Sequence, residues 1–189
     1  MSTTVLYMSM SLDGFIAGPN AGPGNGLGDG GERLHEWSFD GSTPVHKIIY
    51  DEFMATGAVV AGRGTFEPAG GWGGDHHGGV PIWIYSRRDP GLDISGWPLV
   101  TYVDEVATAF AEARAAAGAR DVMVHGAAVT QLALADGLLD ELEIHVIPVL
   151  LGRGRRLFDD LPPGQIELER TRVLEGEEGV THMRYRVRR

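Results

Sequence analysis

The chain has 189 residues, enough for one domain, and its 43% hydrophobic content is ordinary for a globular protein. It has no cysteine, which excludes disulfides, thiolate chemistry and thiolate metal sites. The net charge of -10 disfavours nucleic acid as a partner, and no stretch approaches the ~20 apolar residues that span a bilayer. With no signal peptide visible, we expect one cytoplasmic domain over residues 1–189, without nucleic-acid or membrane partners.

The first half of the chain predicts strands that end in glycine-rich segments. Residues 4–10 form a mostly buried strand, followed by a long loop over 13–31 that is rich in Gly, Pro and Asn. Thr43 or Ser42 caps a helix with Pro44 in its first turn. The further expected elements are a buried parallel strand at 58–61, a short helix at 62–67 and a second glycine-rich loop at 70–79.

The second half alternates strands and helices and then turns to strands alone. Strands are expected at 80–85, 99–102, 122–124, 141–150, 166–174 and 180–187, with helices from a cap at Asp104 to Gly118 and over 127–136. The last two strands read as an antiparallel hairpin. This order predicts a three-layer α/β fold, with a largely parallel central sheet covered by helices on both faces and an antiparallel C-terminal edge.

Three strand-to-loop junctions carry residues that suit phosphate. Gly62-Arg63-Gly64-Thr65 offers free backbone N–H groups, a hydroxyl and a guanidinium at a helix start. Ser86-Arg87-Arg88 is a local excess of positive charge after a strand, and Gly126-Ala127-Ala128-Val129-Thr130 is a helix start of small residues. Each junction also has a purely structural interpretation: a capped turn for the first, a solvated turn for the second and close helix–sheet packing for the third. Ligands of open α/β sheets bind at strand ends, so the three together favour a dinucleotide.

Two other motifs favour no ligand. The stretch from Gly26 to Gly31 matches G-x-G-x-x-G, but it neither follows a strand directly nor opens a clear helix, so we interpret it as a flexible loop or lid. Adjacent His76 and His77 in an extended stretch would point to opposite sides, and no third ligand has suitable spacing. We therefore expect no metal site.

His125 and Asp13 are the candidates for chemistry on the substrate side. His125 ends a strand and would face the cleft, although a structural histidine is the alternative. Asp13 follows the first strand, where it could act on a substrate or brace the loop. There is no G-x-S-x-G elbow, which weakens a hydrolase reading.

Three segments in family order resemble the dihydrofolate-reductase-like superfamily. They are Met8 to Ala17, the motif Gly62 to Glu67, and Asp140 to Leu142 followed by Pro148 to Gly154 and Leu157-Phe158. More closely, they are similar to the reductase domain at the C-terminus of bifunctional riboflavin-biosynthesis deaminase–reductases. The resemblance covers nearly the whole chain.

The resemblance implies an NADPH-dependent reductase that transfers a hydride to a small heterocyclic or ribosylamino-pyrimidine-like molecule. It implies phosphate at Gly62 to Thr65, the adenosine 2′-phosphate at Ser86, Arg87 and Arg88, and pyrophosphate at Gly126 to Thr130. Ser9, Ile16 and Ala17 would lie by the nicotinamide, and His46 and Trp72 could wall the substrate. The late strands around Glu141 to Leu151 would supply a homodimer interface, as they do in the family.

The chain also departs from the family. His125-Gly126-Ala127 stands where the riboflavin-pathway enzymes usually show a glutamate and two glycines, and that glutamate contacts the pyrimidine. The carboxylate that binds the pterin in dihydrofolate reductases has no clear counterpart near Val45-His46-Lys47, where Asp40 and Asp51 lie only roughly nearby. A dihydrofolate or pterin reductase, a non-catalytic NADPH-binding module and a purely structural dimer are the alternatives.

Overall fold

A computed structural model describes residues 2–39 and 43–188 of the chain. Its strands are β1 Thr4–Ser11, β2 Phe15–Ala17, β3 Ala58–Gly62, β4 Ile82–Tyr85, β5 Val100–Val103, β6 Val122–His125, β7 Glu141–Ile147, β8 Arg155–Arg156, β9 Leu168–Glu175 and β10 Thr181–Val187. Its α-helices are α1 Glu36–Phe39, α2 Pro44–Met54, α3 Arg63–Phe66, α4 Val106–Ala117 and α5 Ala127–Ala135. Short 3-10 turns are η1 Gly31–Leu34, η2 Gly70–Gly74 and η3 Glu177–Gly179.

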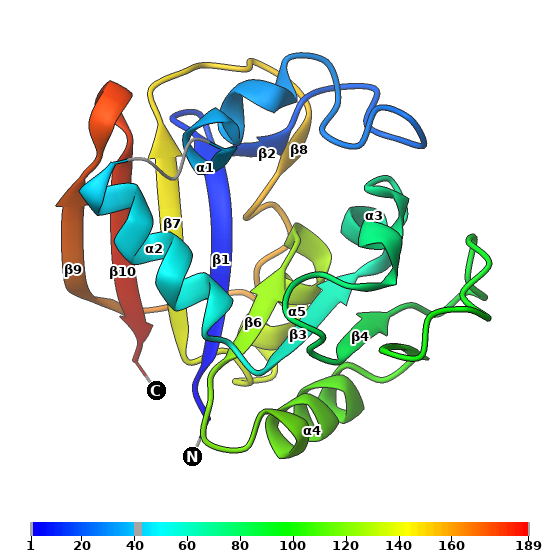
Figure 1. The fold of residues 1–189 in the computed structure, drawn as a ribbon. Coiled ribbons are helices and arrows are strands. Elements are labelled where there is room, and N and C mark those ends of the chain that lie inside the picture. Colours follow the sequence, from blue (N-terminus) through cyan, green and yellow to red (C-terminus); the bar gives the residue numbers. More distant parts are fainter. Residues whose placement is uncertain (1, 40–42, 189) are drawn as a thin grey trace.

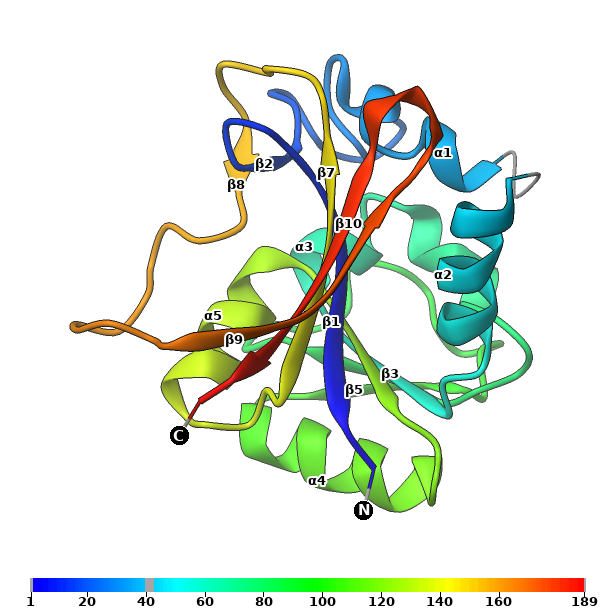
Figure 2. The ribbon, with the colours of Figure 1, turned by 90° about the vertical axis from the view of Figure 1, so that its left-hand side faces the viewer.

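Eight strands form one sheet in the order β5-β4-β3-β6-β1-β7-β10-β9. Neighbours from β5 to β7 are parallel, while β10 runs antiparallel to both β7 and β9. Helix α2 covers one face, and α4 and α5 cover the other (Figures 1 and 2). The predicted three-layer α/β fold with an antiparallel C-terminal edge is thereby confirmed.

The period-two alternation of β1 explains how one strand serves two cores. Leu6 and Met8 pack with α4 and α5 in the larger core cluster. Val5 and Tyr7 face the other way and join the cluster around Phe66. Because β1 is central and buried on both faces, nearly every position along it is excluded from solvent.

A polar layer fills the space between α2 and the antiparallel edge. Glu143 of β7 is fully buried, and Arg172 of β9 donates to it at 2.9 Å. Arg172 also forms a two-pronged pair with Glu52 of α2, while Arg184 of β10 pairs with Glu141 at 2.7 Å. These arginines are neutralised by carboxylates, so they add little net positive charge to this side of the sheet.

The sequence predicts the start of α2 correctly but not the start of α4. Thr43 caps α2 as predicted, because its hydroxyl accepts from the backbone N–H of His46, and Pro44 opens the helix. The expected cap at Asp104 is wrong: α4 begins after Glu105, whose side chain makes no capping bond. Among the described residues, no helix has the length and apolar character needed to cross a membrane.

Candidate active site

A cavity of about 900 Å³ opens at the carboxyl-terminal edge of the parallel strands. Of the residues predicted to hold a ligand, it is lined by Ser9, Ile16, Ala17, Gly64, Thr65, Trp72 and His125. These come from β1, β2, α3, η2 and β6, which sequence separates but the parallel sheet brings to one edge. The loop after β2 lines the cavity too, and Gly26 lies so close to the carbonyl of Pro68 that a side chain there would clash.

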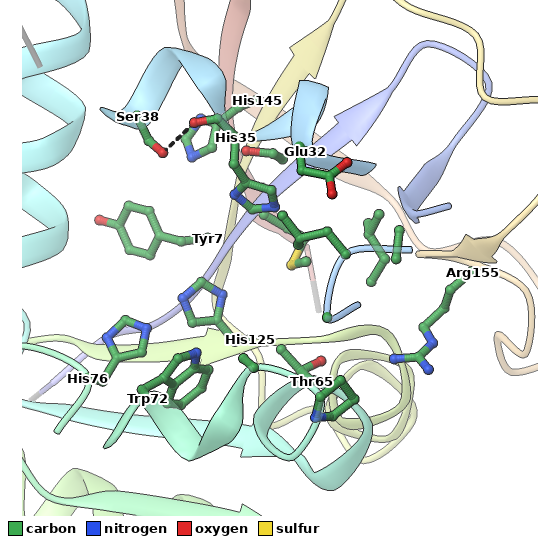
Figure 3. A pocket seen from close by; sticks show the side chains of 18 of the residues that line it. Tyr7, Glu32, His35, Ser38, Thr65, Trp72, His76, His125, His145 and Arg155 are labelled. Carbon is green, nitrogen blue, oxygen red and sulfur yellow. Dashed lines mark hydrogen bonds between the residues drawn. The ribbon is translucent and has the colours of Figure 1, made fainter. Parts of the chain in front are cut away.

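The cavity has two chemically different ends. Thr65 and Arg155 lie at one end, while Tyr7, Trp72 and His76 lie at the other, with His125 between them (Figure 3). Arg155 is anchored at the first end, where its guanidinium donates to the carbonyl of Gly64. Among the described lining residues, Arg155 and Glu32 are the ones with a formal charge at pH 7.

Aromatic rings wall the second end. The His76 ring lies 4.4 Å from Trp72, 5.2 Å from Phe53 and 5.1 Å from His125, centroid to centroid. Phe53 in turn contacts Tyr7 edge-on at 6.3 Å. We call the rings of Tyr7, Phe53, Trp72, His76 and His125 the aromatic box. Such a wall favours a flat, weakly polar guest.

Trp72 reaches the box from an unusual backbone. It has φ 50°, and Gly70, Gly71, Gly73 and Gly74 around it are also at positive φ. A side chain at Gly71 or Gly74 would meet Trp97 at 2.4 Å, so the turn depends on glycine for space as well as for conformation. A non-glycine residue held in this region stores strain, which is typical of functional sites.

Hydrogen bonds fix the orientation of His76. The Thr56 hydroxyl donates to the carbonyl of Phe53 at 2.8 Å and lies 3.0 Å from Nε2 of His77. Since Thr56 has a single hydroxyl proton, Nε2 of His77 must be the donor to it. Nδ1 of neutral His77 is then an acceptor, so Nδ1–H of His76, 2.8 Å away, donates to it. Nε2 of His76 is left as an acceptor, on the ring edge opposite His77.

The histidines of the cavity are held neutral. Burial lowers the pKa of His125 to about 4 and that of His76 to about 2. Burial also lowers the pKa of His35 and of His145. As predicted, His125 lies at the end of β6 and lines the cavity. At neutral pH its imidazole carries no charge; its N–H is engaged by the backbone carbonyl of Tyr7, and its other ring nitrogen is an acceptor.

Two helix starts meet at the charged end. Gly62 precedes α3 and Gly126 precedes α5, and neither start has a side-chain cap. Gly126 has φ 97°, and a Cβ there would lie 2.3 Å from Oγ1 of Thr65. The uncapped N–H groups of the first turns are therefore available to an anion, and the glycine is what lets the two starts approach.

A second cavity of about 600 Å³ adjoins the first across Arg155, which lines both. Ala127 and Ala128 line it, together with Arg156. Val129 and Thr130 do not: Val129 belongs to the core, and the Thr130 hydroxyl donates to the carbonyl of Gly126. The expected pyrophosphate segment therefore presents the backbone N–H groups of the first turn of α5, and not the Thr130 side chain, to this region.

The arginines expected at the 2′-phosphate lie on the surface beyond β4. Arg87 and Arg88 are exposed, and the Ser86 hydroxyl is bonded to the backbone of Arg88. The turn lines neither cavity described above. Arg63 points to the same side, where it is paired with Glu67 at 2.7 Å. Glu67 also accepts from the N–H of Gly91, and so ties α3 to the loop after this turn.

Asp13 takes the bracing role and does not line the main cavity. Its carboxylate accepts from the Ser11 hydroxyl at 2.6 Å and from the N–H groups of Leu151 and Gly152 at 3.1 and 2.7 Å. These bonds, led by that of Ser11, lower the pKa of Asp13. The geometry therefore places Asp13 as a clamp between the β1–β2 turn and the segment after β7.

His46 also lies behind the cavity wall. It is buried, with its ring 5.4 Å from Trp37 and 5.3 Å from His182. Trp37 itself lines the cavity and donates its indole N–H to the Ser9 hydroxyl at 2.9 Å. Ser9 thereby keeps its own proton free to donate toward a ligand.

Several lining residues escaped prediction from the sequence. They are Tyr7, Phe53, Trp37, His35, His145 and Arg155. Arg155 directly follows the late segment from Pro148 to Gly154, which was a usable signal. Tyr7 and His145 sit within strands and read as core positions. The sequence suggests His76 only as a metal ligand, and the described residues contain no cluster of three or more acidic or histidine side chains suited to a metal.

Comparison with known proteins agrees with this architecture. The model of the RibD C-terminal domain family matches residues 90–182. An uncharacterized Bacillus subtilis protein, YwjB, is 30% identical over 167 residues, covering 84% of this chain and 83% of that protein.

Solved structures share the fold. A putative riboflavin biosynthesis protein from Shewanella sp. PV-4 has a TM-score of 0.76 and 22% identity, with both chains covered completely. Acinetobacter baumannii RibD has a TM-score of 0.65 at 17% identity, and this whole chain covers 59% of it. A pyrimidine reductase-like protein from Corynebacterium diphtheriae has a TM-score of 0.61 at 14% identity, with 100% of this chain and 92% of that one covered. The matches in sequence place the chain in the RibD C-terminal domain family, and the solved structures show that it shares their fold.

Proposed function

We propose that this protein is an NADPH-dependent reductase of a small heterocyclic molecule. The observation that carries the proposal is the pair of adjoining cavities at one sheet edge, with Arg155 between them. One cavity ends at open helix N–H groups and arginines, and the other ends in an aromatic box. An elongated anionic cofactor and a flat substrate would meet near His125.

The residues at the charged end fit the cofactor's phosphates. The N–H groups at the start of α5, the Thr65 hydroxyl and Arg155 are donors, and the tight approach of Gly126 to Thr65 leaves no room for a side chain. Arg87 and Arg88, with Arg63, would receive a 2′-phosphate at the outer end. Ile16 and Ala17, which are buried and line the cavity, would hold the nicotinamide together with Ser9.

When bound, NADPH supplies the hydride. The chain's own task is to orient the acceptor and keep water out, which the apolar and aromatic lining does. His125 remains neutral at pH 7 and its N–H is engaged by the backbone carbonyl of Tyr7, so its other ring nitrogen can accept a hydrogen bond from the substrate and orient it. Its neutral imidazole is a poor acid, so the proton that accompanies the hydride is drawn from water at the cavity mouth.

The test is calorimetric titration of the purified protein with NADPH and NADH, followed by an oxidation assay over pterins, flavin precursors and quinones. We expect saturable binding of NADPH, preferred over NADH, and oxidation by at least one heterocycle. No measurable NADPH binding would refute the proposal. Stoichiometric binding without turnover on the whole panel would instead favour the non-catalytic module.

We also propose that the protein is a homodimer through its late segments. Val173 and Leu168 of β9 are each 42% exposed, and Leu150 after β7 is 69% exposed. Exposed apolar side chains on these segments favour contact with a second copy. Light scattering coupled to size-exclusion chromatography checks this, and a monomer at micromolar concentration would contradict it.

A further inference from the structure

The geometry points to a flat, uncharged heterocycle as the substrate, one that carries no phosphate and presents an N–H group to Nε2 of His76. This inference rests on the proposed function and defines its substrate class. It sets the protein apart from a reductase of phosphate-bearing ribosylamino-pyrimidines. Three observations carry it: the charge of the cavity, the rings of the aromatic box and the hydrogen-bond chain behind His76.

The aromatic box offers no cation to a phosphate. Of the described lining residues, Arg155 is the one positively charged group, and it lies with Thr65 at the opposite end (Figure 3). The lining histidines are neutral at pH 7 because burial lowers their pKa. Arg184, the cation behind Tyr7, is paired with Glu141. A phosphate in the box would lose its hydration without gaining a partner, which is strongly unfavourable.

The box suits a flat guest. Its members come from β1, α2, η2, the segment after η2 and β6. Neighbouring rings are in contact, with centroids 4.4 to 6.3 Å apart, and together they form one continuous aromatic wall of the cavity. Stacking and edge contacts with such rings favour a planar heteroaromatic guest. The strained backbone of Trp72 is consistent with a side chain placed for this purpose.

The hydrogen-bond chain from Phe53 through Thr56 and His77 determines which ring nitrogen of His76 carries the proton. Each link fixes the direction of the next, so Nδ1 of His76 carries the proton and Nε2 is a bare acceptor. An acceptor inside an apolar wall selects a ligand with a donor and rejects an analogue that lacks it. Thr56 and His77 touch no ligand in this scheme and act as positioning residues.

The direct test uses three probes that differ by one feature. Quinazolin-4(3H)-one is flat, uncharged and has the N–H; its 3-methyl derivative lacks the N–H; its 7-carboxylate adds a charge. Binding is followed by quenching of tryptophan fluorescence, with and without saturating NADP⁺. We expect the parent compound to bind at least tenfold more tightly than either derivative. Equal or tighter binding of the carboxylate, or no binding of the parent at millimolar concentration, would overturn the inference.

Matched variants test the hydrogen-bond chain. His76→Phe keeps a ring in the box, so the parent should still bind but lose its advantage over the 3-methyl probe. Thr56→Val should reduce that advantage, whereas Thr56→Ser, which restores the hydroxyl, should keep it. Nitrogen-15 NMR of the histidine rings should show the proton of His76 on Nδ1. A proton on Nε2, or an N–H preference that survives His76→Phe, contradicts the scheme.

The probes separate this inference from the proposed function. If NADPH binds and is oxidised by some substrate, but the parent probe shows no preference, the substrate class alone is wrong. If the probes behave as expected while NADPH does not bind, the cofactor assignment fails and the aromatic box stands as a site for uncharged heterocycles.

Discussion

Nδ1 of His76 lies 2.8 Å from Nδ1 of His77, so the two neighbouring rings share a hydrogen bond. In an extended chain they would point to opposite sides, and that expectation is wrong here, because the segment after η2 bends and brings the rings together. The pair links Thr56, behind the wall, to the cavity itself. The two histidines, which resemble a metal motif in the sequence, are therefore hydrogen-bonded parts of the cavity wall.

Buried neutral histidines make the fold sensitive to acid. Burial lowers the pKa of His182 to about 4, and five others are also lowered: His35, His76, His77, His125 and His145. The unfolded chain binds protons below its ordinary histidine pKa of about 6.5, before the folded protein does, so stability falls as pH drops from there toward the folded pKa values. The lowered pKa of His182 alone should reduce the free energy of unfolding by roughly 2 kcal/mol between neutral pH and pH 5.

Denaturant unfolding at a series of pH values between 5 and 8 measures this. The free energy of unfolding should fall steeply below pH 6.5. Because His76→Phe removes one such group, it should reduce the slope by up to about 1.4 kcal/mol per pH unit. A flat profile between pH 7 and 5, or a variant with the parent's slope, would show that these histidines titrate normally.

Gly126→Ala should weaken cofactor binding. The new methyl group would lie 2.3 Å from Oγ1 of Thr65, at φ 97°, and would push apart the two helix starts proposed to hold the phosphates. We expect the Kd for NADPH to rise at least about tenfold, or about 1.4 kcal/mol. Gly137→Ala is the matched control, since it also has positive φ but nothing within 4 Å. Equal affinities in the two variants would argue against the site.

Arg87→Ala should reduce the preference for NADPH over NADH. Arg87 is exposed after β4, where its guanidinium is available for a 2′-phosphate. Loss of one charge-assisted contact should lower the ratio of affinities about tenfold, corresponding to about 1.4 kcal/mol, with NADH binding little changed. Calorimetry with both cofactors measures the ratio. An equal loss of affinity for NADPH and for NADH would mean that Arg87 stabilises the fold or contacts the phosphates that both cofactors share.

His125→Phe should lower kcat with little change in the Kd for NADPH. The variant preserves a ring at the centre of the cavity but removes the hydrogen bond proposed to orient the substrate, for which a loss of about 10²-fold is expected. In the parent enzyme, the activity should not show a histidine titration between pH 6 and 8, because the pKa of His125 is about 4. A titration near pH 6.5 that disappears in His125→Phe would instead assign His125 an ordinary acid–base role.

The order and type of the main elements follow from the sequence, because their signals are local. The apolar run at 58–61, flanked by Gly57 and Gly62, predicts a short strand buried on both faces, and Thr43-Pro44 is typical of a helix start. The approach of Gly126 to Thr65 required the strand order, because β3 and β6 are neighbours in the sheet but not in the chain. The Asp104 cap failed because a capping residue one position away from the real helix start gives the same local signal.

The substrate side was decided by tertiary structure. Whether Asp13 meets a ligand or braces a loop depends on where Leu151 and Gly152 pass, 138 and 139 residues later. Whether His46 or His76 reaches the cavity depends on which side of α2 and which turn of the glycine-rich loop faces inward. The sequence by itself determined the layered sheet and the glycine-rich strand ends at its cavity edge, because these rest on periodicity and on glycine at strand ends. The aromatic box and its directed hydrogen bonds required the fold, because they join five segments whose side chains have no local reason to meet.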